Sequence, residues 1–280
     1  MHLSTQTSTL NYESVKFWYD LGVKRVVLAR ELHIKEIAEI KKHVPEMELE
    51  AFVHGAMCMS YSGRCLLGDY FSGRPGNKGE CSHGCRFKYK VRLEEERRPG
   101  KLYQMEGDEE GSHILSSKDL CTIDRLEEIL PYVDALKIEG RSKSEFYVGA
   151  VVKAYKHVRD ALVAGTPIDE NIKNLVNKIP HRAYREGFLF NDLKDFPEKE
   201  EEGSTTLDTA GPLFNRNYFG TFTDKSIEYE GKTYYAITPK EVIEIGTKLS
   251  YISAENVGTI VIENILDINQ KPTAKVTCNS

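Results

Sequence analysis

The stretch ALKIEGRSKSEFYVGAVVKAYKHVRDALVA, residues 135–164, decides the fold. It opens with a short β-rich run, Ala135 to Ile138, that ends in the polar residues Glu139-Gly140-Arg141. A helix is predicted from about Ser144 to Ala164, with Gly165 as its stop, because apolar residues recur there at 3.6-residue spacing: Val148, Val151, Val152, Tyr155, Val158 and Leu162. The stretch therefore indicates a strand followed directly by a helix.

The same alternation is present upstream. Strands are predicted at 3–6, 25–29 and 48–53, separated by a helix opening at Asn11 and by another that carries Ile34, Ile37 and Ala38. Strands that alternate with helices favour a parallel sheet, in which chemistry gathers at the carboxyl ends of the strands. The polar residues expected at those ends are Gln6, Arg30, Glu31, His54, Glu139 and Arg141.

We therefore predict an α/β fold, a partial TIM-like (β/α) barrel over residues 1–194, followed by a small all-β barrel domain. The acidic, turn-rich segment 195–212 has the composition of a linker, and 213–280 holds short strands separated by Gly and Asn turns. A complete barrel needs eight strands, whereas only about four are predicted before residue 165. We expect either a truncated form or a half that pairs with a partner chain supplying the missing strands; the β-domain need not be complete.

Composition narrows the function classes. The hydrophobic fraction of 40% and the net charge of −5 are ordinary for a globular protein and give no global attraction toward phosphate backbones. The chain shows no signal-peptide pattern and no long apolar run, so we expect a cytoplasmic protein without a membrane or DNA partner. Clustered cysteines in that reducing compartment more often bind metal than form disulfides.

Four cysteines stand in one Gly-rich loop at 55–92, with the spacing C-x6-C-x15-C-x3-C: Cys58, Cys65, Cys81 and Cys85. Thiolates favour iron–sulfur clusters and zinc over hard cations. The spacing differs from the paired C-x2-C zinc knuckle, but zinc, unligated thiols and redox disulfides stay open on the residues alone. Cys121 is interpreted as a small buried residue at a helix start.

Several motifs resemble the collagenase-like peptidase family U32. The similarity starts in Glu50-Ala51-Phe52-Val53-His54-Gly55-Ala56-Met57-Cys58 and Gly63-Arg64-Cys65-Leu66-Leu67. It continues through Cys81, Cys85-Arg86, Ser117-Lys118-Asp119-Leu120, Leu136-Lys137-Ile138-Glu139-Gly140-Arg141 and His181-Arg182. Gly68 departs from the serine usual in the signature, and the amino-terminal part of the barrel is missing.

The resemblance implies a TIM-like barrel with a carboxyl-terminal β-domain and a [4Fe–4S] cluster held by the four cysteines. Family members act in oxygen-independent hydroxylation of tRNA wobble uridine, of a ribosomal RNA cytidine or of ubiquinone precursors. The pattern is most similar to the tRNA 5-hydroxyuridine branch, in which prephenate is implicated as hydroxyl source. We therefore expect an iron–sulfur enzyme acting on the tRNA anticodon loop; a collagenase-like peptidase and a non-catalytic subunit or scaffold are the alternatives.

Residues around the loop are candidates for substrate contact. Basic side chains interleaved with aromatics suit contact with unpaired RNA, and we assign this role to Arg64, Arg86, Lys88, Tyr89 and Lys90, with Arg74, Lys78, Tyr70 and Phe71 nearby. A solvated strand face explains the alternation from 87 to 92 equally well.

Catalytic candidates come from the strand ends. Lys137, Glu139 and Arg141 alternate along one strand, so they are predicted to share a face and to orient a carboxylated donor or an RNA phosphate. A salt-bridged barrel rim is the alternative. His54, four residues before Cys58, is the candidate base that a thiol peptidase would need. No H-E-x-x-H zinc protease motif is present.

Overall fold

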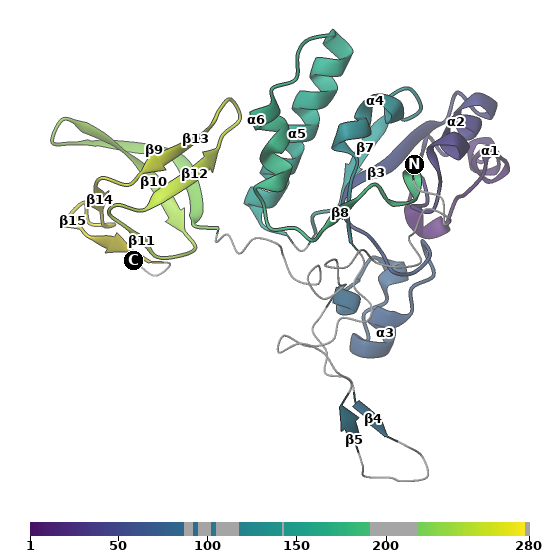
Figure 1. The fold of residues 1–280 in the computed structure, drawn as a ribbon, viewed down its shortest axis with the longest axis horizontal. Coiled ribbons are helices and arrows are strands. Elements are labelled where there is room, and N and C mark those ends of the chain that lie inside the picture. Colours follow the sequence, from purple (N-terminus) through teal and green to yellow (C-terminus); the bar gives the residue numbers. More distant parts are fainter. Residues whose placement is uncertain (87–91, 95–101, 105–117, 142, 191–217, 278–280) are drawn as a thin grey trace.

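The computed structural model describes residues 1–86, 92–94, 102–104, 118–141, 143–190 and 218–277. They form a larger α/β part up to residue 190 and a smaller β part from 218 onward (Figure 1). In Figure 1 the long helix α5 lies between the sheet of the larger part and the strands of the smaller one. None of the helices in these described ranges is long and apolar enough to cross a membrane.

One sheet organises the larger part. Four of its strands run parallel in the order β1, β2, β3 and β7, and β6 pairs antiparallel with the end of β3 while β8 pairs parallel with β6. The strands are β1 (His2–Leu3), β2 (Arg25–Val27), β3 (Glu48–Ala56), β6 (Asp119–Cys121), β7 (Ala135–Ile138) and β8 (Tyr184–Arg185), with a separate hairpin of β4 (Arg92–Glu94) and β5 (Leu102–Gln104).

The helices of this part are α1 (Tyr12–Asp20), α2 (Ile34–His43), α3 (Leu67–Ser72), α4 (Leu126–Ile129), α5 (Glu145–Ala164) and α6 (Glu170–Lys173). The predicted limits of α5 are confirmed. Ser144 caps its first turn by accepting a hydrogen bond from the Tyr147 amide, and Gly165 ends it in a left-handed conformation. The expected apolar stripe is only partly buried, because Val148 and Val152 are exposed.

The main hydrophobic core lies on one face of the sheet, under the helices. Alternate residues of β3, Leu49, Ala51 and Val53, are at most 3% exposed and pack with Val15 of α1 and Ile37 of α2. The opposite face carries a small separate cluster of Val27, Phe52 and Leu120, with Met57 packed against it. The sheet thus separates a large helical core from a smaller apolar cluster on its other side.

The barrel predictions are not confirmed. The α/β class and the parallel strands are present, but the hydrogen-bonded ladders of the described residues form an open sheet, with β1 at one edge. Four short parallel strands supply too few ladders to close a barrel, because closure requires each edge strand to find a partner. The sheet is also mixed, which the sequence alternation did not indicate.

Cys121 corrects a second expectation. It ends strand β6 instead of beginning a helix, and its sulfur accepts a hydrogen bond from the Tyr155 hydroxyl at 3.8 Å. Burial raises the pKa of the Cys121 thiol. The three residues of β6 were too short a run to be recognised in the sequence, although they place Asp119 beside the end of β3.

The smaller part contains β9 (Gly220–Tyr229), β10 (Lys232–Pro239), β11 (Ile243–Glu244), β12 (Lys248–Ile252), β13 (Val257–Val261), β14 (Ile265–Leu266), β15 (Pro272–Thr273) and β16 (Lys275–Val276). They pair as two-stranded antiparallel sheets around a core of Ile243, Leu249 and Val276, and these described ladders do not close a barrel.

The two parts touch along α5. Lys153 on α5 donates hydrogen bonds to the carbonyls of Ser253 and Ala254 at 2.9 and 3.0 Å, and Tyr218 donates to Glu145 at 2.9 Å. The predicted linker, 195–212, lies outside the described residues, so the domain limits stay a prediction.

Candidate functional site

The cysteine loop leaves the sheet at the end of β3. Cys58 follows Ala56 by two residues, Cys65 precedes α3, and Cys81 and Cys85 lie in the turns after it. All four thiols are free, and no group of three or more His, Cys, Asp and Glu side chains in the described residues is arranged as metal ligands.

Polar residues at the strand ends hold this loop in place. Gln6, just after β1, donates from its side-chain amide to the Gly76 carbonyl at 3.1 Å. After β2, the Arg30 amide donates to the Ser62 hydroxyl, and the Glu31 carboxylate accepts from the Ser62 amide at 2.8 Å. Most of the residues expected to do chemistry at the strand ends therefore anchor the loop.

Gly63 lets the loop come close to the turn that follows β1. Gly63 has φ of +73°, and a Cβ there would lie 2.0 Å from the Gln6 carbonyl oxygen. A Cβ on Gly76 would lie 3.7 Å from the Cβ of Cys81 and 3.9 Å from that of Cys65. Gly76 thus lies between two of the cysteines.

The loop has no apolar core of its own. Between residues 57 and 86 the buried positions are Ser62 and three glycines, whereas Met59, Tyr61, Leu66, Tyr70 and Phe71 are all exposed. A segment with so little buried apolar surface gains stability from a metal or disulfide crosslink. This is the first observation that fits the loop to a thiolate-bound group.

The charges around the thiols are the second observation that fits the loop to a thiolate-bound group. Neighbouring protein atoms remove water from the Cys58 thiol and raise its pKa, and the charge of Arg30 offsets part of that rise. Burial likewise raises the pKa of the Cys85 thiol, and the charge of Arg86 offsets part of it. Each of these two thiols also interacts electrostatically with Cys65 and Cys81, so the four groups lie near one another. Four soft donors beside cations fit an anionic thiolate cluster.

The predicted catalytic trio forms ion pairs and loop contacts. Lys137 forms an ion pair with Glu50 at 2.5 Å, and Glu139 lies 3.9 Å from Arg30. Arg141 donates to the Gly79 carbonyl of the cysteine loop. This arrangement matches the salt-bridged rim that was the alternative in the sequence, and the role of the trio in orienting a donor stays a prediction.

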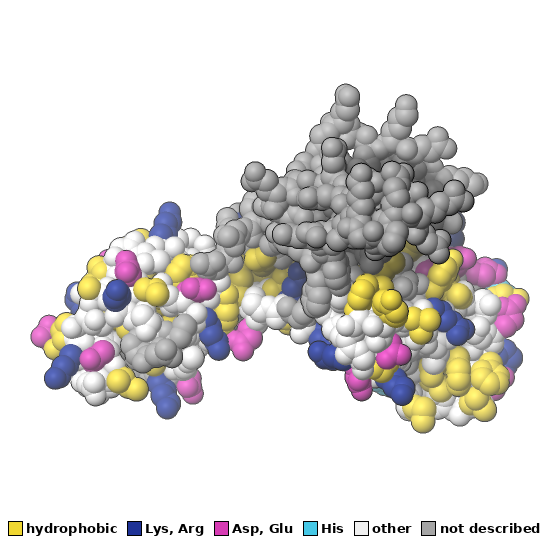
Figure 2. Space-filling view, turned by 90° about the horizontal axis from the view of Figure 1, so that it is seen from below, with side chains coloured by type: hydrophobic (Ala, Val, Ile, Leu, Met, Phe, Trp, Pro, Cys, Tyr) yellow, Lys and Arg dark blue, Asp and Glu magenta, His cyan; other side chains and the backbone are white. Residues whose placement is uncertain are grey.

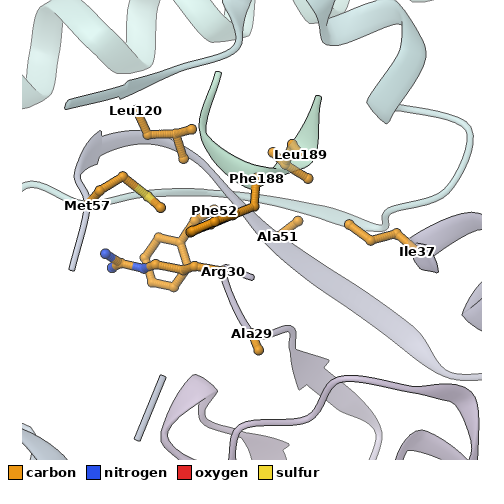
Figure 3. A pocket seen from close by; sticks show the side chains of 9 residues that line it. All are labelled: Ala29, Arg30, Ile37, Ala51, Phe52, Met57, Leu120, Phe188 and Leu189. Atoms are coloured by element: carbon orange, nitrogen blue, oxygen red, sulfur yellow. The ribbon is translucent and has the colours of Figure 1, made fainter. Parts of the chain in front are cut away.

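A small pocket lies next to this rim, and residues of both the helical core and the Phe52 cluster line it. The Arg30 guanidinium lies over the Phe52 ring, 3.9 Å from its centroid, and Met57 and Phe188 approach the same ring (Figure 3). The pocket is lined by Ala29, Arg30, Ile37, Ala51, Phe52, Met57, Leu120, Phe188 and Leu189. Its lining is apolar apart from the one guanidinium.

His54 is buried away from Cys58. A register shift between β3 and β7 falls at Val53, and His54 packs against Tyr155 and Tyr184 with ring centroids 5.4 and 5.3 Å away. Neither ring nitrogen has a hydrogen-bond partner among the described residues. Burial lowers the pKa of His54 to about 3, so the imidazole is neutral. The thiol–imidazole pair of a cysteine peptidase is therefore not formed.

A cluster of buried charge lies beside His54, and we refer to its four residues, Arg86, Asp119, Lys143 and Arg182, as the Asp119 cluster. Asp119 is fully buried and accepts from Arg86 at 2.8 Å and from the Arg182 amide at 3.2 Å, with Lys143 at 4.0 Å. Burial alone would raise the pKa of the Asp119 carboxyl, but Arg86 and Lys143 overcome that effect and lower it.

The predicted RNA contacts divide into three groups. Arg64, Arg74 and Lys78 are exposed on the loop near Tyr70 and Phe71, whose rings lie 5.3 Å apart. Arg86 instead belongs to the Asp119 cluster, and its side chain is 11% exposed. The remaining candidates, Lys88, Tyr89 and Lys90, lie outside the described residues. On the face drawn in Figure 2, basic and acidic side chains are interspersed over both parts.

With this geometry described, comparison with known proteins gives the family. The model of peptidase family U32 matches residues 1–198, which is more than half of the chain. The chain belongs to peptidase family U32. No solved structure matches it.

Curated relatives carry names of three kinds, for tRNA hydroxylation, proteolysis and ribosomal RNA modification. The tRNA hydroxylation protein P of Escherichia coli is 33% identical over 95% of this chain and 65% of its own length. A Methanocaldococcus jannaschii protein named an uncharacterized protease is 40% identical over 74% and 51%. The Escherichia coli 23S rRNA 5-hydroxycytidine synthase is 34% identical over 58% and 24%. The chain thus spans less than two thirds of each of these relatives.

Of the Asp119 cluster, only Arg86 has a role predicted from the sequence, as an RNA contact. Asp119 and the pair His181-Arg182 are parts of the U32 resemblance, and no sequence pattern marks Lys143. A buried Asp directly before an apolar β residue, together with a His-Arg pair, is a weak signal. Its meaning depends on β6 and β8 pairing, which brings Asp119 opposite Tyr184.

Proposed function

We propose that this chain acts in the oxygen-independent hydroxylation of tRNA, forming 5-hydroxyuridine at the wobble position. The carrying observation is the conjunction of the four-cysteine loop at the end of β3 with relatives named for tRNA hydroxylation. A relative named for 5-hydroxycytidine synthesis in ribosomal RNA supports the broader class of RNA hydroxylation.

The proposal includes a [4Fe–4S] cluster held by Cys58, Cys65, Cys81 and Cys85. With every iron bound by a cysteine, such a cluster would supply electron transfer or a structural crosslink. The chain's own contribution is positioning. The strand-end residues anchor the loop, and the charges of Arg30 and Arg86 favour the thiolate forms of Cys58 and Cys85. Because the Cys58 and Cys85 thiols have raised pKa values, cluster binding must displace protons from them.

The exposed aromatic and basic side chains of the loop are the proposed RNA contact. Tyr70 is 84% exposed and Phe71 50% exposed, so both rings can stack on unpaired bases. Arg64, Arg74 and Lys78 are the neighbouring cations for backbone phosphates. An anticodon loop suits this surface because its bases are unstacked more readily than those of a duplex.

Prephenate as the hydroxyl source is part of the same proposal and rests on the U32 resemblance. A partner chain that completes the sheet stays a prediction in the same way. The peptidase alternative has a relative with a protease name in its favour, but His54 gives no support to it, since its neutral imidazole has no hydrogen-bond partner among the described residues.

Mass spectrometry of nucleosides tests the proposal. tRNA and ribosomal RNA are digested from a strain lacking this chain and from strains complemented with the wild type, Cys81→Ser or Cys121→Ser. We expect 5-hydroxyuridine to be lost from tRNA on deletion and restored by the wild type and by Cys121→Ser, but not by Cys81→Ser. Unchanged 5-hydroxyuridine on deletion contradicts the proposal, and a change in ribosomal 5-hydroxycytidine alone redirects it to ribosomal RNA.

A further inference from the structure

The Asp119 cluster has more positive than negative charge. Three cationic side chains, Arg86, Lys143 and Arg182, surround the buried carboxylate of Asp119, and the Glu139 carboxylate also acts on Lys143. The Asp119 carboxylate is fully buried, Arg182 is 8% exposed, and the side chains of Arg86 and Lys143 are 11% and 24% exposed. Charges removed from water are costly unless they are paired, so such a set favours a further anion.

Polar atoms without a partner point to the same place. Among the described residues, buried side-chain atoms that lack a hydrogen bond include Arg182 Nη1, Tyr147 Oη and both ring nitrogens of His54. Buried polar groups in native proteins nearly always have a partner, so an unpaired group calls for a water, an ion or a ligand. These four atoms belong to three residues that lie in one neighbourhood.

These groups form a connected ring of contacts. Lys143 Nζ lies 4.8 Å from the Tyr147 ring centroid, and the Tyr147 and His54 rings are 6.0 Å apart. His54 lies 5.3 Å from Tyr184, which stacks on His181 at 3.9 Å. His181 precedes Arg182, whose backbone amide donates to Asp119 and so closes the ring. One side of the ring is cationic and the other is aromatic and neutral.

We propose that Arg182, Lys143 and Arg86 bind a small carboxylate beside the His54 imidazole and the Tyr147 hydroxyl. Arg182 supplies a guanidinium nitrogen that has no partner in the described chain, and planar guanidinium groups match carboxylates in a bidentate geometry. Lys143 is the most exposed of the three cations and marks the side from which a ligand enters. The burial of Arg182 and Asp119 excludes an RNA backbone, which is too bulky.

The neutral side of the ring fits the rest of such a ligand. Tyr147 and His54 offer a hydroxyl and an uncharged imidazole, which can hydrogen-bond an alcohol or a carbonyl, and Tyr184 adds an apolar ring face. Arg182 also interacts with Cys85, so the bound carboxylate would lie near the cysteine loop. Only the further step of naming this ligand as the hydroxyl donor rests on the proposed function; the binding site does not.

Calorimetric titration of the full chain, purified anaerobically, with sodium malonate tests the site. Ionic strength is held constant with chloride, and inorganic phosphate is titrated in parallel. We expect saturable malonate binding that Arg182→Gln and Lys143→Met each weaken by at least about tenfold, the size of a lost charge-assisted hydrogen bond. Arg159→Gln and Lys156→Met are matched controls, since each removes one cation paired with Asp160 on the exposed face of α5.

Two outcomes overturn the inference. Absence of saturable malonate binding, or equal weakening by the control variants, excludes a specific site, and tighter binding of phosphate than of malonate excludes the carboxylate assignment. A readout on the wild type avoids dependence on folded variants: malonate should slow acetylation of Lys143 by at least about tenfold relative to Lys156, measured by peptide mass spectrometry. None of these experiments uses RNA, so a failure here and a failure of tRNA hydroxylation are distinguishable.

Discussion

The cysteine loop and the Asp119 cluster lie near one another at the same end of the sheet, but they are built in opposite ways. The loop is held mainly through backbone and strand-end contacts, and its large apolar side chains are exposed. The Asp119 cluster is held by ion pairs between side chains and is buried against the helical core. The loop therefore depends on a crosslink for its stability, whereas the Asp119 cluster is supported by the core around it and has more cations than carboxylates.

The largest effect expected concerns the loop. Cys81→Ser removes one of four thiolates and should abolish most iron binding, because an iron–sulfur cluster needs its full ligand set. Cys121→Ser is the matched control, since Cys121 lies in β6 and bonds to Tyr155. Iron content after anaerobic purification measures both. Loss of iron in Cys121→Ser alone would show that the ligand assignment is wrong.

The next largest effect concerns the Asp119 cluster. Asp119→Asn leaves three cations without their carboxylate, and we expect a loss of about 3–5 kcal/mol in the free energy of unfolding, as for other broken buried ion pairs. Glu128→Gln, which removes an exposed partner of Arg125, should cost far less. Urea unfolding compares the two variants, and similar losses for both would contradict the burial argument.

Acid should reproduce part of this loss. Because the folded pKa of Asp119 is lowered, its stabilising contribution is complete above the unfolded value of about 4 and is lost as pH falls through the lower folded value. The wild type should therefore lose stability more steeply than Asp119→Asn below about pH 4. Parallel acid unfolding curves would contradict this.

A smaller effect distinguishes the close contact made by one loop glycine from the left-handed conformation that two loop glycines share. Gly63 and Gly73 both have positive φ, at +73° and +61°, but of the two only Gly63 is placed so that a Cβ would collide with another segment, at the carbonyl of Gln6 in the turn after β1. Each Ala substitution should carry the left-handed penalty of about 1–2 kcal/mol. Gly63→Ala should in addition lower iron occupancy, whereas Gly73→Ala should not. Equal iron contents would show that the close approach to Gln6 is not required.

The last effect is a pH dependence. His54 has a folded pKa of about 3, below its unfolded value of about 6.5, so the unfolded chain binds more protons between these limits. The folded state should lose up to about 1.4 kcal/mol per pH unit as pH falls through that window. Burial also lowers the pKa values of His181 and His83. The contribution of His54 is therefore the difference between wild type and His54→Gln in the slope of stability against pH. Identical slopes would show that the His54 side chain is exposed to water in the folded protein.

Local patterns predicted local structure well. The limits of β7 and α5 follow from a β-rich run and from an N-cap serine with a C-terminal glycine, all within one stretch of chain. The cysteine loop was recognisable because its signal is a residue type at fixed spacing. The strands β6 and β8 are only three and two residues long, and their pairing is decided by contacts across the sheet.

The site was less predictable than the fold for the same reason. Lys137 and Arg141 could be seen as polar residues at a strand end, but not that their partners would be Glu50 and Gly79. Asp119, Lys143 and Arg182 come from three separate segments, and only their common burial gives them significance. Sequence periodicity does not report on such charge balance.

Iron and acid-labile sulfide analysis of the anaerobically purified wild-type chain tests the central claim most directly. We expect about four irons and four sulfides per chain, with visible absorbance that is lost when Cys58, Cys65, Cys81 and Cys85 are all replaced by serine. Stoichiometric zinc without sulfide, or iron that persists after all four replacements, would contradict it.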